Sequence, residues 1–489
     1  MLAAPDGRPV AAPRGQLLQP WTWPSYLLKL LPSDARHDPL SRPAVRHAPF
    51  LAPADDPARQ ALDAWLEAFN ANDRARLAAF RDRYLPTFDV DGMLEFHGQT
   101  GGFRLLRREP SPPGTARALV QEAASDTVAR VSVTVAAGKP LALDIAAIER
   151  PDDLRIPRLD RAGAIAALAA KADAEAAQDA FSGVLLVARG DEVLLQRAWG
   201  LADRAAGTPV TLQTKFRLGS MDKMFTAVAT LQLVGAGRLA LDDTVGQHLP
   251  GYPNAEIGKV TIRQLLTHAG GTGDIFGPAF VQHRTTLKTH DDYVRLFGAR
   301  GPTHAPGQGF EYSNYGYVLL GAIIERVSGQ SYYDYIARHV FAPAGMRDSG
   351  SLPEGTKVPG RAHAYTRKDG RWIDAADTLP YRGTAAGGGY STAADLLKFV
   401  RALRDGTLLP PALLADATRR QTPWYGYGFM VGQRQGVAGF GHGGGAEGMN
   451  AALGVFPAQD TVVIGLANVD PPAVERLVDF YTARMPLDP

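Results

Sequence analysis

The chain of 489 residues contains no cysteine, which excludes disulfide bonds, thiol nucleophiles, and zinc or iron–sulfur sites built on thiolates. It also lacks any apolar run near the roughly 20 residues that a transmembrane helix requires, so we expect no membrane span. An excess of one charge is missing as well: 52 basic residues face 50 acidic ones. Nothing in this balance favours nucleic-acid binding.

Several common catalytic and cofactor motifs are absent too. The sequence has no G-x-S-x-G elbow, no H-E-x-x-H pair, no Walker loop and no G-x-G-x-x-G loop between a strand and a helix. These absences disfavour an α/β-hydrolase, a zinc peptidase and a nucleotide-binding enzyme. We therefore expect neither a metal ion nor another cofactor. Lysine is scarce, with 10 residues in the chain, so a lysine inside a motif carries more information than usual.

The composition divides the chain into four segments. Residues 1–55 form a Pro-rich extension, since eleven of the first 57 residues are proline, which blocks helix interiors and sheet ladders. No secretory leader is recognisable there, and the compartment stays open between periplasmic or secreted and cytoplasmic. Residues 56–150 show two apolar helical stripes and then four strand-like runs, which predict a small α+β domain of two helices and a four-strand meander. Residues 151–164 are a polar linker, and residues 165–489 form one large domain.

The large segment carries strands at both ends. It opens with an Ala-rich helix over 165–180 and a hairpin over 183–199, and it closes with a hairpin over 451–467 and a helix over 472–485. A mostly helical stretch lies between them. The pattern predicts an α+β fold in which both ends of the domain build one antiparallel sheet, with flanking helices and an inserted helical subdomain.

The first candidate for chemistry is Ser220-Met-Asp-Lys223. Apolar residues follow at helical spacing, so Ser220 is expected at a helix N-terminus, with Lys223 one turn away on the same face. A serine hydroxyl needs an adjacent base to act as a nucleophile, and Lys223 is placed to be that base. Taken alone, the pair could equally be a helix cap followed by a solvated lysine.

Two further motifs carry polar groups or glycine. Tyr312-Ser-Asn314 precedes an apolar helix and offers a phenol for proton relay and an amide that both donates and accepts. The run His442-Gly-Gly-Gly445 stands between strand-like segments, where bare backbone N–H groups could form an oxyanion hole. Three aromatic residues upstream are candidates either for the wall of the acyl site or for the core: Trp424, Tyr425 and Tyr427.

The order Ser-x-x-Lys, Tyr-x-Asn, His-x-Gly resembles the penicillin-recognising serine hydrolases. The nearest branch holds class C β-lactamases, D-stereospecific peptidases and β-lactamase-like esterases. Segments 265–271, 387–393 and 242–250 resemble the same branch. The resemblance spans about residues 175–485 and implies the β-lactamase/transpeptidase-like fold.

The resemblance also implies roles for these residues. Ser220 corresponds to the acylated nucleophile, and Lys223 and Tyr312 to a pair of general bases. Asn314, His442, Gly443 and Gly444 correspond to substrate-binding positions, and the N–H groups of Ser220 and Gly445 to the oxyanion hole. His268 lies in a family-like segment and is interpreted as structural.

Many relatives carry lysine where this sequence has His442. Histidine, with a reference pKa near 6.5, would hold a substrate carboxylate less firmly than lysine does. We therefore expect hydrolysis of carboxylic esters with small or medium acyl groups. The alternatives are a D-aminopeptidase, D-Ala-D-Ala peptidase or weak β-lactamase, and an acylated sensor that does not turn over. The expected partner is a small-molecule ester, amide or D-peptide. For the N-terminal domain, the hypothesis is either a lid or a homo-oligomer contact.

Overall fold

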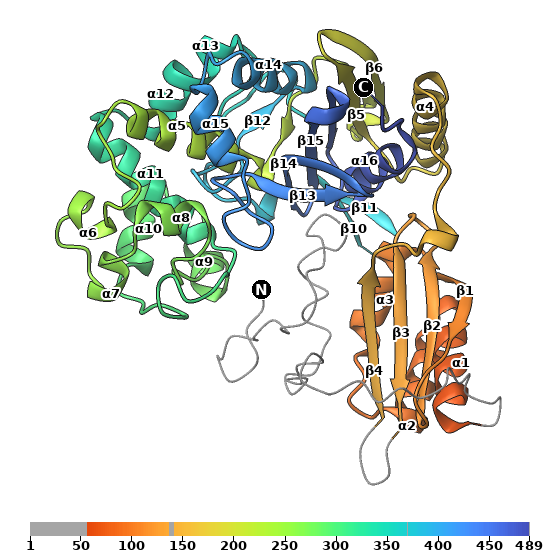
Figure 1. The fold of residues 1–489 in the computed structure, drawn as a ribbon. Helices are drawn as coiled ribbons and strands as arrows, with labels where there is room; N and C mark the ends of the chain where they lie inside the picture. Colours follow the sequence, from red (N-terminus) through yellow and green to blue (C-terminus); the bar gives the residue numbers. More distant parts are fainter. Residues whose placement is uncertain (1–55, 136–140, 369, 489) are drawn as a thin grey trace. The chain divides into compact units, whose positions relative to one another are not determined.

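The computed structural model describes residues 56–135, 141–368 and 370–488 (Figure 1). The predicted Pro-rich extension lies outside these residues. The chain divides into two compact units, Met1–Pro157 and Arg158–Pro489. In the described part of the chain, no helix combines the length and the apolar character needed to cross a membrane.

The first unit is a four-stranded antiparallel meander packed against helices, with strand order β1-β2-β3-β4. The elements are α1 (Pro57–Asn70), α2 (Arg74–Tyr84), α3 (Val90–Thr100), β1 (Phe103–Glu109), β2 (Thr115–Glu122), β3 (Val128–Thr134) and β4 (Ala142–Ile148). The sequence predicted two helices and therefore missed α3. Two glycines, Gly92 and Gly98, lower the intrinsic helix propensity of this short segment. Asp89 caps it by accepting the N–H of Gly92 at 3.0 Å.

The core of the first unit is aromatic. Trp65 of α1 is fully buried, and its ring lies 5.1 Å from that of Phe69. Phe69 also stacks on Phe103 of β1 at 5.2 Å, so α1 is fixed on the sheet by large apolar contacts.

The second unit is built on a six-stranded antiparallel sheet of order β13-β14-β15-β16-β5-β6. The strands are β5 (Gly183–Arg189), β6 (Glu192–Trp199), β13 (Met430–Arg434), β14 (Val437–Ala446), β15 (Met449–Phe456) and β16 (Thr461–Ala467). β16 pairs with β5, with Ile464 opposite Leu186. The two ends of the domain therefore meet in one sheet, as the sequence predicted.

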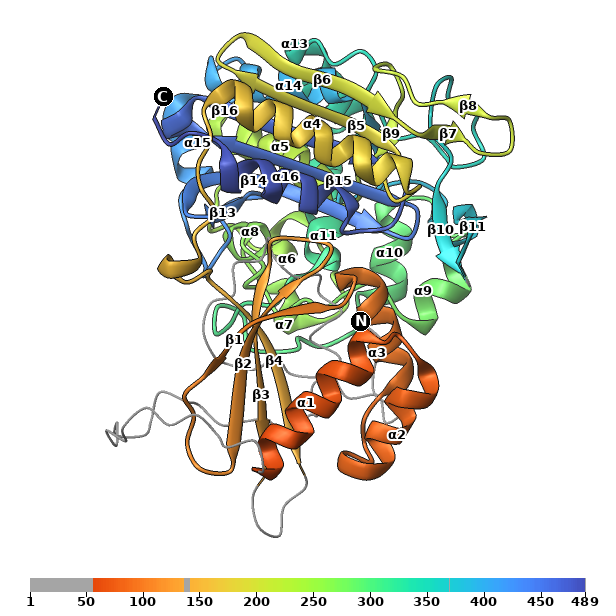
Figure 2. The same cartoon turned by 90° about the vertical axis from the view of Figure 1, so that its right-hand side faces the viewer.

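Both faces of this sheet are covered. On one face lie α4 (Arg161–Ala177) and α16 (Ala473–Arg484), which Figure 2 shows in front of the strands. Leu185 and Val187 of β5 pack in their core, whereas Val184 and Leu186 point into the core shared with the helical part. Since successive side chains alternate between two buried faces, β5 is apolar from Gly183 to Ala188.

The helical part lies between β6 and β13 in sequence. Its helices are α5 (Lys223–Gly235), α6 (Val245–His248), α7 (Ala255–Gly258), α8 (Ile262–Leu266), α9 (Pro278–His283), α10 (His290–Phe297), α11 (Asn314–Ser328), α12 (Tyr332–Ile336), α13 (Ala342–Ala344), α14 (Ala393–Arg404) and α15 (Pro411–Ala417). Short strands complete it: β7 (Leu201–Asp203), β8 (Thr208–Pro209), β9 (Phe216–Arg217), β10 (Tyr365–Lys368), β11 (Arg371–Asp374) and β12 (Tyr390–Ser391). A 3₁₀ turn, η4 (Gly219–Asp222), leads directly into α5.

Candidate functional site

Ser220 and Lys223 lie where η4 passes into α5. Ser220 belongs to the 3₁₀ turn and Lys223 is the first residue of the α-helix. The spacing of three residues brings the lysine Nζ to 3.1 Å from the serine Oγ. A hydroxyl and an amine thus lie within hydrogen-bond reach of each other, as a nucleophile and its base must.

The Lys223 amine is enclosed by oxygen acceptors. Besides Ser220 Oγ, its Nζ contacts Asn314 Oδ1 at 2.7 Å and the Ala386 carbonyl at 2.6 Å. The side chain is fully buried. Burial lowers the lysine pKa to about 7, although the carboxylates of Asp274 and Asp222 act in the opposite direction. Near neutral pH, a substantial fraction of this amine is therefore unprotonated.

Tyr312 lies on the other side of the lysine. The Lys223 Nζ is 4.8 Å from the centre of the tyrosine ring. Burial raises the pKa of the phenol above its usual range, while a hydrogen bond with Ser220 acts against that shift. Tyr312 is therefore a protonated phenol at neutral pH, and its ring lies beside the Lys223 amine.

Asn314 starts α11, and a carboxylate that the sequence did not single out holds its amide. The Asn314 Nδ2 donates to both oxygens of Asp274, at 3.0 and 3.1 Å. This orientation leaves Oδ1 facing Lys223. Asp274 lies 40 residues away in a segment without regular structure, so no local spacing links the two residues.

His268 supports the segment that carries Tyr312 and Asn314. Its Nδ1 accepts the backbone N–H of Ser313 at 3.0 Å, and its ring lies 4.2 Å from the Tyr312 ring. The residue is buried and adopts a positive φ of 57°. These contacts orient Tyr312 and do not reach the Ser220 hydroxyl.

His442 of β14 is completely buried. Its Nδ1 lies 2.5 Å from the Gly443 carbonyl, so this nitrogen carries the proton, and Nε2 accepts from the Tyr425 hydroxyl at 2.7 Å. Burial, together with the positive charge of Lys223, lowers its pKa to about 3. His442 is thus a neutral group held by Tyr425, which belongs to the core.

The glycines after His442 allow β14 to lie against the nucleophile turn. A Cβ on Gly444 would come within 1.9 Å of the Leu218 carbonyl and 2.8 Å of the Ser220 nitrogen. A Cβ on Gly445 would meet the Pro471 ring at 2.4 Å. Only glycine at position 444 permits this approach, which brings the backbone of Gly444 beside Ser220 and the Gly445 nitrogen beside Gly219.

The third support of Lys223, the Ala386 carbonyl, belongs to a Gly-rich turn over 383–389. Asp222 holds this turn by accepting the Gly389 N–H at 2.5 Å, and the Leu218 N–H donates to the Gly389 carbonyl at 2.8 Å. Sequence reasoning noted the glycines but missed Ala386, since a backbone carbonyl leaves no signal in residue type.

Metal binding has no evident place in this arrangement. Among residues 56–135, 141–368 and 370–488, no three His, Asp or Glu side chains gather in a group that could hold a metal ion. The site consists of an alcohol, an amine, a phenol and an amide, which together can exchange protons.

Comparison with known proteins finds a matching family model and several similar chains. A family model described as Beta-lactamase matches residues 166–484. A putative penicillin-binding protein, PbpX of Bacillus subtilis, is 31% identical over 293 residues, which cover 59% of this chain and 71% of that protein. Esterase EstB of Burkholderia gladioli is 34% identical over 290 residues, which cover 50% of this chain and 74% of that protein.

A solved structure shares the fold. The D-stereospecific amidohydrolase from Streptomyces sp. has a TM-score of 0.54 and 29% sequence identity, covering 64% of this chain and 97% of that one. The match to the family model falls within the second unit, which holds all the residues described above.

Proposed function

Because the chain belongs to the beta-lactamase family of serine hydrolases, we propose that it hydrolyses carboxylic esters of small or medium acyl groups through an acyl-enzyme on Ser220. One observation carries the proposal: a buried amine with a pKa of about 7 lies 3.1 Å from the serine hydroxyl. Such an amine can be neutral when substrate arrives, and a neutral amine can accept the serine proton.

In the acylation step, Lys223 takes the proton from Ser220 Oγ as this oxygen attacks the ester carbonyl. The N–H groups of Ser220 and Gly445 stabilise the resulting oxyanion. When the tetrahedral intermediate collapses, the bond to the leaving oxygen breaks, and Tyr312 gives its proton to that oxygen. Lys223 then returns the serine proton to the tyrosine.

Deacylation follows the same path in reverse. Water loses its proton to the Tyr312 and Lys223 pair, attacks the acyl carbonyl, and the acid leaves as Ser220 recovers its proton. Asn314 orients the lysine and the substrate throughout. No step requires a group from outside the chain other than substrate and water.

The preference for esters is supported by His442. A neutral imidazole with a pKa of about 3 provides no positive charge for a substrate carboxylate at neutral pH. β-Lactams and peptides with a free C-terminus carry such a carboxylate, whereas simple esters do not. The relative EstB is named an esterase, which agrees with this preference.

The direct test compares a chromogenic short-chain ester with a chromogenic cephalosporin. We expect ester turnover by the wild type, none by Ser220→Ala, and a loss of about 10²- to 10⁴-fold in kcat/KM for Lys223→Ala. Ser328→Ala and Lys259→Ala change the same residue types outside the site and should keep the activity. Ester turnover that persists in Ser220→Ala would refute the proposal.

A second candidate is hydrolysis of D-amino-acid amides or D-peptides. It is favoured by the similarity to the Streptomyces D-stereospecific amidohydrolase. A kcat/KM for D-amino-acid amides above that for short acyl esters would select it. A lasting adduct on Ser220 after exposure to a β-lactam, seen by intact mass without turnover, would instead indicate an acylated sensor.

A further inference from the structure

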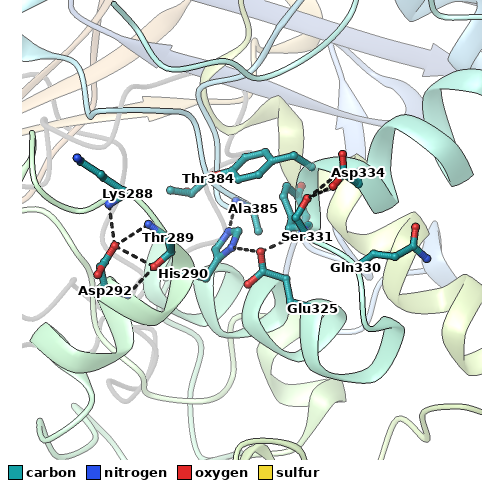
Figure 3. Close-up of polar contacts among 12 residues, drawn as sticks. Lys288, Thr289, His290, Asp292, Glu325, Gln330, Ser331, Asp334, Thr384 and Ala385 are labelled. Atoms are coloured by element: carbon teal, nitrogen blue, oxygen red, sulfur yellow. Dashed lines mark hydrogen bonds and ion pairs between the residues drawn. The ribbon is translucent and has the colours of Figure 1, made fainter.

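His290, the first residue of α10, contacts Ala385 in the turn over 383–389 (Figure 3), and the next residue of that turn supports the Lys223 amine. Its side chain is fully buried. The Ala385 N–H donates to its Nε2 at 3.1 Å, so this nitrogen carries no proton. The ring proton is therefore on Nδ1, which lies 3.2 Å from Glu325 Oε1.

Both ends of this contact are anchored. Thr289 and Asp292 form a reciprocal capping box at the start of α10, which fixes the backbone of His290. The Glu325 carboxylate also accepts the Tyr332 N–H at 2.9 Å, which ties it to the start of α12. Gly321 lies against the imidazole, because a Cβ there would fall 2.6 Å from Nε2.

The residue after Ala385 is Ala386, whose carbonyl accepts from Lys223 Nζ at 2.6 Å. On the opposite side of the same peptide segment, the Thr226 hydroxyl donates to the Ala385 carbonyl at 2.7 Å. Three glycines, 387–389, follow directly. A glycine-rich turn loses much backbone freedom on folding. Hydrogen bonds from residues outside the turn must therefore hold the Ala386 carbonyl in place.

We propose that His290, oriented by Glu325, is a positioning residue for the reaction: it fixes Ala385 so that the Ala386 carbonyl aims the Lys223 amine at Ser220. The inference rests on the proposed function, since it assigns a purpose to the orientation of Lys223. Helix α11 then holds the amine twice, directly through Asn314 at its start and indirectly through Glu325 near its end.

Two substitutions separate this role from a merely structural one. His290→Gln can keep an acceptor near the position of Nε2 and so retain the contact with Ala385. His290→Asn can keep a donor near Nδ1 and retain Glu325, but it loses Ala385. Both variants remove a buried ring, so a structural role would affect them alike.

The measurement is the rate at which Ser220 of the full chain is phosphonylated by an alkyl fluorophosphonate, followed by intact mass, together with the Tm of each variant. We expect His290→Asn to react about 10- to 100-fold more slowly than the wild type, and His290→Gln to stay close to it. Tyr252→Phe, which removes a hydrogen bond to Tyr315 elsewhere in the helical part, should lower Tm without slowing the reaction.

Equal rates in the wild type and His290→Asn, or equal losses in the Asn and Gln variants that follow Tm, would overturn the inference. If a His290 variant does not fold, Glu325→Leu removes the acceptor for Nδ1–H. We expect this variant to react more slowly, and a wild-type rate would again overturn the inference. Labelling that persists in Ser220→Ala would refute the proposed function itself, and the inference with it.

Discussion

Burial displaces the pKa values of Lys223 and Tyr312 in opposite directions, and for the same reason. Removal from water penalises the charged form of each group, which is the ammonium for lysine and the phenolate for tyrosine. Both are therefore accessible as neutral groups near pH 7. The amine is then the better proton acceptor and the phenol the better proton donor, which assigns base and acid within the proposed pair.

The first prediction at this scale concerns pH. Because the neutral form of Lys223 is the active one, kcat/KM should rise with pH through about 7 and then level off. A rise of kcat/KM centred near pH 10.5, the ordinary pKa of lysine, would contradict this prediction. The titration of Asp222 must be distinguished from that of Lys223, because burial raises the pKa of the Asp222 carboxyl to about 7 as well. Asp222→Asn should keep the limb in a pH profile of ester hydrolysis.

Replacing Tyr312 tests the assignment of the acid. Tyr312→Phe removes the proton given to the leaving oxygen, and a poor leaving group depends on that proton more than a good one. We expect kcat/KM to fall at least about tenfold further for an alkyl ester than for a nitrophenyl ester. Equal losses on both esters would mean that Tyr312 does not protonate the leaving group.

At the scale of elements, the central contact is that of β14 with η4. The strand brings the backbone of Gly444 against Leu218 and Ser220, and no side chain fits between them. Asp222 and Gly389 tie the same turn to the 383–389 segment. The turn that carries Ser220 is thus held by two distant segments of the chain, β14 and residues 383–389.

Gly444→Ala should disturb this contact. Its Cβ would lie 1.9 Å from the Leu218 carbonyl, so β14 or the turn must move. We expect a loss of about 1–3 kcal/mol in the free energy of unfolding, together with most of the ester activity. Denaturant unfolding and kinetics on the same sample measure both effects. Gly443→Ala is the stability control, because its Cβ would have no atom nearer than 3.6 Å.

At the scale of the whole molecule, the chain carries two units with separate cores. The aromatic core around Trp65 belongs to the first unit, and the residues of the candidate site all belong to the second. The first unit holds none of the proposed catalytic residues. Association between copies of the chain is the role we propose for it.

Removing residues 1–157 tests that role. We expect the remaining chain to keep its ester kcat per Ser220 while its mass in solution falls to that of a monomer. Light scattering after size-exclusion chromatography measures the mass, and active-site titration gives the number of working sites. An unchanged association state would contradict the proposed contact.

Contacts between residues that are close in sequence could be predicted, whereas contacts between distant segments could not. Ser220 and Lys223 are three residues apart, so helical geometry alone predicts that they meet. The central strands β5 and β16 were equally predictable, because strands buried on both faces of a sheet read as nearly continuous apolar runs. The helix α3 was missed because its glycines weaken the local signal. Asp274 was missed because its contact with Asn314 joins distant segments.

By itself, then, the sequence determined the antiparallel sheet and the inserted helices through apolar pattern, and local spacing predicted that the Ser220 hydroxyl and the Lys223 amine lie close together. The tertiary structure alone decided the protonation of that amine, the neutrality of His442 and the support from Asp274, His290 and Ala386. The physical reason is that burial and hydrogen bonding depend on which distant segments surround a group. A side chain's pKa is therefore a property of the fold, whereas its place on a helix is a property of its neighbours in sequence.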